Sequence, residues 1–342
     1  MGAMLKLTLY IVFHPIRSAV PMFSRSIFFP LFLILSGIPP VFSDSLREEP
    51  ILPIPAPPAE DPRKIALGKR LFQDPQLSKD KTISCERCHR LAEGGHDPRP
   101  FSKGVGGALG SVNAPTVYNS GLNLAQFWDG RAVNLEEQVN APLQNPVEMA
   151  MNWPEVLRRL RADAGYQQAF RALYPDGISA ANVRDAIAAF ERSLLTWNAP
   201  FDRWLRGDET ALSPQALRGY ELFRSYGCIA CHQGANVGGN LYQEMGAMGD
   251  YFADRGTPIT QSDLGRFNVT HQPEDRHFFK VPSLRLAVRT APYFHDASAK
   301  TLEEAIRIMG RYQLGREIPA EDIAPIIAFL QSLVGTHPLL HP

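Results

Sequence analysis

Two segments of the sequence decide the fold of this chain: Cys85-Glu-Arg-Cys-His89 and Cys228-Ile-Ala-Cys-His232, which together use all 4 cysteines. Two thiols at this spacing add across the vinyl groups of a haem, and the histidine that follows binds its iron. A zinc site would need another pair of Cys or His ligands near each motif. A dithiol redox pair would not carry a histidine directly after both copies. We therefore predict two covalently bound haem c groups, held by Cys85, Cys88 and His89 and by Cys228, Cys231 and His232.

A short repeat precedes each haem motif. Leu67-Gly-Lys-Arg-Leu-Phe72 leads to the first and Arg218-Gly-Tyr-Glu-Leu-Phe223 to the second, so each motif follows a G-x-x-L-F sequence. Repetition on this scale predicts two related domains, each closing a core around its own haem. We assign residues 63–205 to an N-terminal haem domain and residues 206–342 to a C-terminal one. A Pro-rich approach segment, residues 44–62, precedes them and is expected to be extended.

Charge and composition narrow the class of protein. The 342-residue chain carries 35 Lys and Arg residues and 35 Asp and Glu residues, so its formal net charge is zero. A nucleic-acid-binding protein normally shows a basic excess, so we predict no nucleic-acid partner. The hydrophobic content of 44% is typical of a globular protein, and the length allows two domains with real cores.

The first 43 residues have the pattern of an export signal. A short apolar run, residues 27–35, is followed by a small residue, Ser43, where signal peptidase can cut. The run is shorter than the roughly 20 residues that span a bilayer, which leaves a membrane anchor as the alternative. We expect cleavage near Ser43 and no stable membrane span in the mature protein. Translation starts at Met1 or at Met22, because Met22 alone could begin a complete signal.

The rest of the chain shows helical periodicity. Ser179 can cap a helix in which Val183, Ile187, Phe190 and Leu194 recur on one face. Residues 94–123 and 235–280 are rich in Gly, Asn, Asp and Pro and are typical of long loops. The predicted fold class is therefore all-α, with two cytochrome c-like domains and long ordered loops. Other helix signals lie at Trp153-Pro154, Ser213-Pro214, and Ile323, Ile327 and Leu330.

The sixth ligand of each haem decides its function. Thr301-Leu-Glu-Glu304 is a capping box that opens a helix with Ala305, Ile306 and Met309 on its apolar face. A methionine ligand raises the haem potential and closes the iron for electron transfer, whereas an open position allows chemistry on a small molecule. Met309 is a candidate for this ligand. Its spacing alone favours the alternative, in which the side chain fills the core.

Several further segments are shared with one family of proteins. With these segments the chain resembles the bacterial di-haem cytochrome c peroxidases, over residues 67–333, and the match is more specific than CxxCH alone. The segments are Ser84-Cys-Glu-Arg-Cys-His89, Asn113-Ala-Pro-Thr-Val117, Gln126-Phe-Trp-Asp-Gly-Arg131, Leu135-Glu-Glu-Gln138, Pro146-Val-Glu-Met149, Lys280-Val-Pro-Ser-Leu-Arg285, Thr290-Ala-Pro-Tyr-Phe-His295, Ile308-Met-Gly310 and Gln313-Leu-Gly315.

The resemblance implies different roles for the two haems. Met309 falls on the methionine that closes the C-terminal, electron-accepting haem, which reverses the preference for core packing. The N-terminal haem binds peroxide, with Glu148 as the acid and base at its open face and Gln138 as the polar residue beside it. Trp128 matches the tryptophan between the haems. A carboxylate in a protein-walled pocket can move a proton between the two peroxide oxygens, which supports the role of Glu148. The alternatives are a solvated helix residue for Glu148, a plain hydrogen-bonding residue for Gln138 and core packing for Trp128.

The resemblance also implies a metal ion, partners and a location. One calcium ion would lie between the domains, bound by the Asn113 side chain and the carbonyls of Thr290 and Pro292, oxygen ligands that suit a hard cation. His295 follows this segment, and its role is open between structure and function. The electron donor would be a small cytochrome c or cupredoxin, the location the periplasm, and a homodimer is common in the family.

Two departures from the family pattern bear on mechanism. Typical members place a second histidine on the N-terminal haem, and here that position is Val105, which cannot bind iron. We therefore predict an open first haem even in the oxidised protein, with no need for reductive activation. His96 is the alternative ligand. The related methylamine-utilisation enzyme, which also has an open first haem, carries Tyr where this chain has Met309, so we expect ordinary peroxidase turnover here.

Three functions remain in competition. The first is reduction of hydrogen peroxide to water with electrons from the small donor. The second is maturation of a side chain in a partner protein by a di-haem oxidase, and Met309 argues against it. The third is a non-catalytic electron carrier or haem sensor, and Glu148 and Gln138 beside an open haem argue against it.

Overall fold

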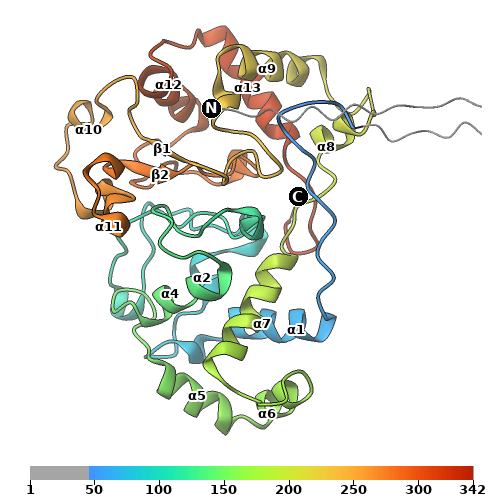
Figure 1. Ribbon diagram of the computed structural model, residues 1–342, viewed down its shortest axis with the longest axis vertical. Coiled ribbons are helices and arrows are strands. Elements are labelled where there is room, and N and C mark those ends of the chain that lie inside the picture. The colour runs from blue at the N-terminus through green and yellow to red at the C-terminus, as the bar shows by residue number, and fades with distance from the viewer. Residues whose placement is uncertain (1–45, 342) are drawn as a thin grey trace, which may run out of the picture. The chain divides into compact units, whose positions relative to one another are not determined.

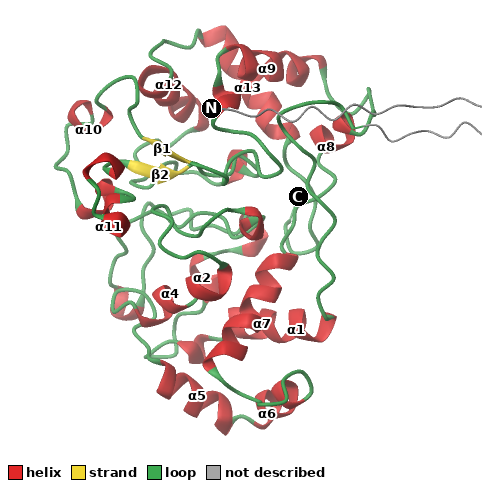
Figure 2. Ribbon diagram, in the orientation of Figure 1, coloured by secondary structure: helices red, strands yellow, loops and turns green. Residues whose placement is uncertain are grey.

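The computed structural model describes residues 46–341, so the predicted export signal lies outside the described residues. Helices and long connecting loops make up almost all of this part of the chain (Figure 2). None of its helices is long and apolar enough to cross a membrane. The elements are α1 (Pro62–Gln73), α2 (Cys85–Cys88), α3 (Leu135–Gln138), α4 (Asn140–Gln144), α5 (Trp153–Ala162), α6 (Ala164–Arg171), α7 (Ala180–Ser193), α8 (Pro200–Leu205), α9 (Pro214–Ser225), β1 (Tyr242–Glu244), α10 (Tyr251–Asp254), α11 (Phe267–Thr270), β2 (Phe278–Lys280), α12 (Leu302–Gln313) and α13 (Ala320–Ser332).

The crossing of α1 and α7 builds the core around the first haem motif (Figure 1). Ser179 caps α7 as predicted, because its side chain accepts a hydrogen bond from the Asn182 N–H. Gly68 lies at the crossing, where a Cβ atom would be 1.9 Å from the Ala186 carbonyl oxygen. Phe72 meets Phe190 edge to face beside it, with ring centroids 5.3 Å apart. The glycine of the repeat is therefore required for the close approach of two helices.

The second copy of the repeat makes the same arrangement. Helix α9 crosses α13 at Gly219, where a Cβ atom would be 1.9 Å from the Pro325 carbonyl oxygen. Phe223 packs against Phe329 with ring centroids 5.0 Å apart. Ser213 caps α9, again as predicted. Each G-x-x-L-F sequence thus encodes one helix crossing, and each crossing anchors a separate hydrophobic cluster.

The two long loop regions are ordered and carry short elements. Residues 94–123 fold through 3-10 turns, whereas residues 235–280 contain α10, α11 and the strands β1 and β2. These strands pair antiparallel, with Tyr242 opposite Lys280. The fold is therefore mostly helical, as predicted, with the addition of this three-residue ribbon.

Each end of the described chain packs on the core that is distant from it in sequence. Ile51 is fully buried in the cluster built by α9 and α13, and the Arg285 guanidinium donates to the Leu52 carbonyl at 3.1 Å. At the other end, Leu339 and Leu340 pack against the cluster built by α1 and α7. Residue Ile51 of the approach segment therefore contributes to the C-terminal core. Residues after α13 complete the N-terminal core.

Candidate haem cavity and active site

One cavity of about 860 Å³ is lined by both CxxCH motifs. Helix α2 supplies Cys85 and Cys88, and the 3-10 turn after α9 supplies Cys228 and Cys231. All four thiols are free. A cavity walled mainly by apolar side chains, with two thiols and a histidine on each side, fits two covalently attached haems.

The two motif histidines are held in the state that binds iron. Nδ1 of His89 donates to the carbonyls of Gly95 at 3.2 Å and Pro115 at 3.1 Å, and Nδ1 of His232 faces the Val237 carbonyl at 3.4 Å. These contacts leave Nε2 as the nitrogen available for iron. Burial lowers the pKa of His232 to about 4 and shifts the pKa of His89 in the same direction, which favours the neutral form of both rings.

Glu148 lies on the cavity wall in the turn after α4, not on a solvated helix. Burial raises the pKa of its carboxyl group, and Asn145 opposes this shift by donating a hydrogen bond of 2.6 Å to Oε1. The backbone of the turn is fixed too, because the Val105 N–H donates to the Glu148 carbonyl at 2.8 Å. A half-buried carboxyl group with a raised pKa keeps its proton to a higher pH than an exposed one, which suits a general acid and base.

Gln138 and Trp128 line the same cavity as Glu148. Gln138 ends α3, whose first turn is capped by the Asn134 side chain. The Trp128 indole N–H donates to the Asn113 carbonyl at 2.9 Å, which fixes the plane of the ring. The structure therefore places all three predicted catalytic residues on the wall of the cavity that both motif histidines also line.

The face of α12 that carries Met309 borders the cavity, and Leu302 and Ile306 on that face also pack against the C-terminal hydrophobic cluster. Leu302, Ala305, Ile306 and Met309 all line the cavity. The capping box predicted at Thr301 is present and starts the helix. Met309 and His232 therefore border the same cavity, as a ligand role for Met309 requires.

Neither Val105 nor His96 is placed to bind the first haem. Val105 packs against the N-terminal core, and neither residue is among those that line the cavity. His96 is 3% exposed, and its Nδ1 has no hydrogen-bond partner within the described residues. The position of His96 therefore gives no support to the alternative that it is the sixth ligand. Gly104 allows the Val105 loop to approach the Glu148 turn closely, because a Cβ at this position would lie 2.2 Å from the Val147 carbonyl oxygen.

The three residues expected to bind calcium are all on the cavity wall. Asn113, Thr290 and Pro292 all line it. The Asn113 amide nitrogen donates to the carbonyls of Arg99 at 3.1 Å and Pro100 at 3.4 Å, which turns its side-chain oxygen away from these partners. Neutral side-chain and backbone oxygens suit a hard cation, so the residues present fit the ion.

His295 is fixed beside Trp128 by a buried ion-pair network. Its Nε2 lies 2.8 Å from Asp263 Oδ1, and its ring meets the indole edge to face at 6.3 Å between centroids. The Arg255 guanidinium lies 2.8 Å from Asp263 and 2.7 Å from Asp296. The single guanidinium offsets one of the two carboxylate charges and bridges both side chains, so the cluster fixes the position of the His295 ring.

Sequence reasoning missed two buried charged residues on the cavity wall, Glu191 and Lys280. Glu191 on α7 is 4% exposed, its Oε2 has no partner among the described residues, and burial raises its pKa to about 8. Lys280 is 8% exposed, and burial lowers its pKa to about 8. Lys280 stands in a segment that carries the family resemblance, and Glu191 follows a buried phenylalanine on the apolar face of its helix. These positions in the sequence could have identified both residues as candidates.

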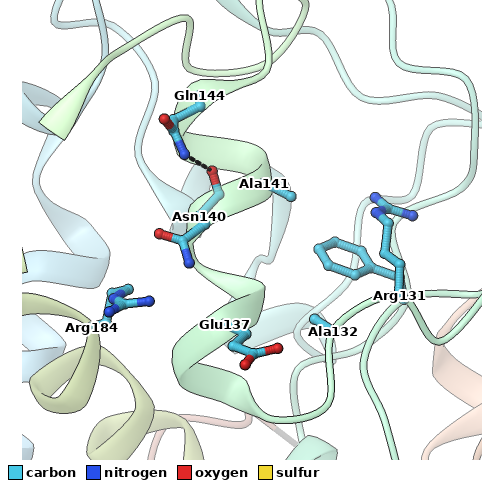
Figure 3. Close-up of a pocket in the computed structure, with 8 residues that line it drawn as sticks. Arg131, Ala132, Glu137, Asn140, Ala141, Gln144 and Arg184 are labelled. Carbon is cyan, nitrogen blue, oxygen red and sulfur yellow. Dashed lines mark hydrogen bonds between the residues drawn. The ribbon is translucent and has the colours of Figure 1, made fainter. Parts of the chain in front are cut away.

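An open pocket of about 510 Å³ adjoins the cavity along α3 and α4 (Figure 3). Arg184 from α7 faces it, and the Gln144 amide donates to the Asn140 carbonyl at 3.2 Å on its wall. The Arg131 guanidinium stacks over the Phe127 ring at 3.6 Å, and these two residues line both the pocket and the cavity. The stacked pair therefore separates the outer pocket from the inner cavity.

Comparison with known proteins agrees with this geometry. The family model for di-haem cytochrome c peroxidase matches residues 62–210. The chain is 48% identical to the cytochrome c peroxidase of Escherichia coli K12 over 85% of its own length, and it spans 62% of the length of that protein. It is 44% identical to the cytochrome c551 peroxidase of Nitrosomonas europaea over 85% of each chain.

A solved structure extends the agreement to the fold. The crystal structure of a MauG-like protein associated with microbial copper homeostasis superposes with a TM-score of 0.75 at 29% identity, covering 84% of this chain and 95% of that one. Two cysteine–histidine motifs on one cavity, a matching family model and relatives above 40% identity over most of the chain give one conclusion: the chain belongs to the di-haem cytochrome c peroxidase family.

Proposed function

We propose that this protein is a periplasmic peroxidase that reduces hydrogen peroxide to water with two electrons from a small donor protein. The observation that carries the proposal is the single cavity that joins His89, Glu148 and Gln138 to His232 and Met309. A carrier needs two closed haems and no acid near either. The names of the relatives, cytochrome c peroxidase and cytochrome c551 peroxidase, support the same activity and a cytochrome as the donor.

Two haem c groups would be held by the cysteines of the two motifs, in two cytochrome c-like domains that meet at this cavity. When bound, the haems supply the redox chemistry: the first binds the substrate and the second passes electrons to it. Glu148 would take a proton from the nearer peroxide oxygen and return it to the farther one, so that the bond breaks with water as the leaving group. Its raised pKa suits both steps. Gln138 would orient the substrate by hydrogen bonding.

The first haem would need no reductive opening. Val105 replaces the usual second histidine and is packed in the core, and its backbone holds the Glu148 turn in place. Peroxide would therefore meet a preorganised acid in the oxidised protein.

Electrons would enter at the second haem. Met309 would close its iron and raise its potential, and Trp128 would lie on the path toward the first haem. Calcium at Asn113, Thr290 and Pro292 would fix the relative placement of the two haem domains. Docking of a small cytochrome c or a cupredoxin near the second haem completes the cycle, in a monomer or a homodimer.

The test of the proposal is peroxide-dependent oxidation of reduced cytochrome c by the purified holoprotein. We expect turnover in the wild type and a loss of about 10²- to 10⁴-fold in kcat for Glu148→Gln, the range for removing a general acid–base group. Glu137→Gln is the matched control, because Glu137 is exposed and lines the outer pocket instead. Activity that Glu148→Gln leaves intact would refute the role of the carboxylate. Absence of turnover in the wild type would favour the carrier or the maturation oxidase.

A further inference from the structure

Lys280 is a buried lysine whose ammonium group lacks a partner in the described part of the chain. It ends β2, is 8% exposed and lines the haem cavity. Burial lowers its pKa, and no carboxylate within residues 46–341 counters that effect. A buried ammonium without an anion is strongly unfavourable, and buried lysines in proteins are nearly always paired. The cavity is therefore expected to supply an anion when it is filled.

The backbone around Lys280 ties it to both the tryptophan and the second motif. The Lys280 N–H donates to the Trp128 carbonyl at 2.8 Å, and the Gly239 N–H donates to the Val281 carbonyl at 2.7 Å. The next carbonyl, that of Pro282, lies near His232, because a Cβ on Gly238 would be 2.3 Å from this oxygen and 3.4 Å from His232 Nδ1. Lys280 thus stands where the wall of the second haem site meets Trp128.

The group that fills this cavity carries its own anions, because each haem has two propionate carboxylates. We propose that Lys280 binds a propionate of the second haem through a charge-assisted hydrogen bond and so fixes that edge of the haem beside Trp128. Lys280 is then a positioning residue that also sets the haem potential, since a nearby positive charge favours the reduced iron. The inference depends on the two haems that family membership implies and not on peroxide turnover, so either can fail without the other.

The test uses holoprotein with both haems attached, in the variants Lys280→Met and Lys280→Arg. Lys300→Met is the matched control, because Lys300 is an exposed lysine on the same half of the chain. Midpoint potentials come from spectroelectrochemical titration, and the propionate bending bands from resonance Raman spectra. We expect Lys280→Met to lower the potential of the second haem and to shift its propionate band. Lys280→Arg should stay near the wild type, and Lys300→Met should change neither quantity.

Two results would overturn the proposal. One is a Lys280→Met protein whose potentials and propionate bands match those of Lys300→Met. The other comes from the wild type alone, which keeps the test valid if Lys280→Met fails to fold. Exchange into D2O replaces the ammonium protons, so the propionate band of the second haem should shift. A band that is unchanged by exchange would show that no such hydrogen bond exists.

Discussion

The crossing of α1 and α7 has no room for a side chain at Gly68. In Gly68→Ala the new Cβ would lie 1.9 Å from the Ala186 carbonyl oxygen and 2.8 Å from the Phe190 Cβ. Non-bonded heavy atoms prefer separations of about 3.5 Å or more, so the helices must separate by more than about 1 Å. Overpacking of this kind costs about 1–3 kcal/mol or more, and the better helix propensity of alanine returns up to about 1 kcal/mol. Because the contact at 1.9 Å is with backbone, we take the upper end of the overpacking cost, about 3 kcal/mol, and expect a net loss of about 2 kcal/mol.

The measurement is thermal unfolding of the holoprotein, followed by circular dichroism and by the absorbance of the first haem. A loss of about 2 kcal/mol lowers Tm by roughly 4–8 °C in a domain of this size. The matched control is Gly165→Ala on α6, where the residue is exposed and the new Cβ meets only the flexible ends of Arg70 and Asp163. If Gly68→Ala unfolds at the same temperature as Gly165→Ala, then the repeat does not encode a close helix crossing.

Three further predictions follow from the same structure. Gly219→Ala should destabilise the second haem domain by a similar amount, because its Cβ would lie 1.9 Å from the Pro325 carbonyl oxygen; a thermal scan read at the second haem checks this. Met309→Leu should keep the packing volume but open the second iron, giving a high-spin signal and loss of donor-driven turnover; an unchanged spectrum would exclude Met309 as a ligand. Glu191 has a folded pKa of about 8 against an ordinary 4.5, so its contribution to stability is full below about pH 4.5 and is lost as pH rises through about 8, by on the order of 4–5 kcal/mol at most. Glu191→Gln should flatten that slope in urea unfolding between pH 5 and 9, and a slope equal to that of the wild type would contradict it.

Features with a local cause were predictable from the sequence. Ser179 and Thr301 cap their helices by accepting a hydrogen bond from an N–H three residues later in the chain. Such a bond is local and needs no tertiary contact, so the sequence alone predicts it. The glycine of each repeat was also visible as a pattern. Its reason, the close approach of α1 to α7 and of α9 to α13, depends on helices more than 100 residues away in sequence and emerges only in the fold.

The candidate site divides in the same way. The cysteines and histidines of the motifs could be predicted from the spacing that haem attachment requires. Glu148 could be predicted only from the family resemblance, and its position depends on a turn that a hydrogen bond from the Val105 N–H holds. The burial of Lys280 could not be predicted from the sequence, because it results from loops that come from distant parts of the chain. The packing of Ile51 on the C-terminal core could not be predicted either, because a Pro-rich segment has no sequence pattern that identifies the core it contacts.

The central claim is that the two irons are unequal in the oxidised protein. In this proposal His89 would serve an open iron that faces Glu148, and His232 would serve an iron closed by Met309. The most direct test is an electron paramagnetic resonance spectrum of the fully oxidised holoprotein at low temperature. We predict one high-spin ferric signal from the first haem together with one low-spin signal from the second. Two low-spin signals would contradict the account, because a protein ligand would then close the first iron.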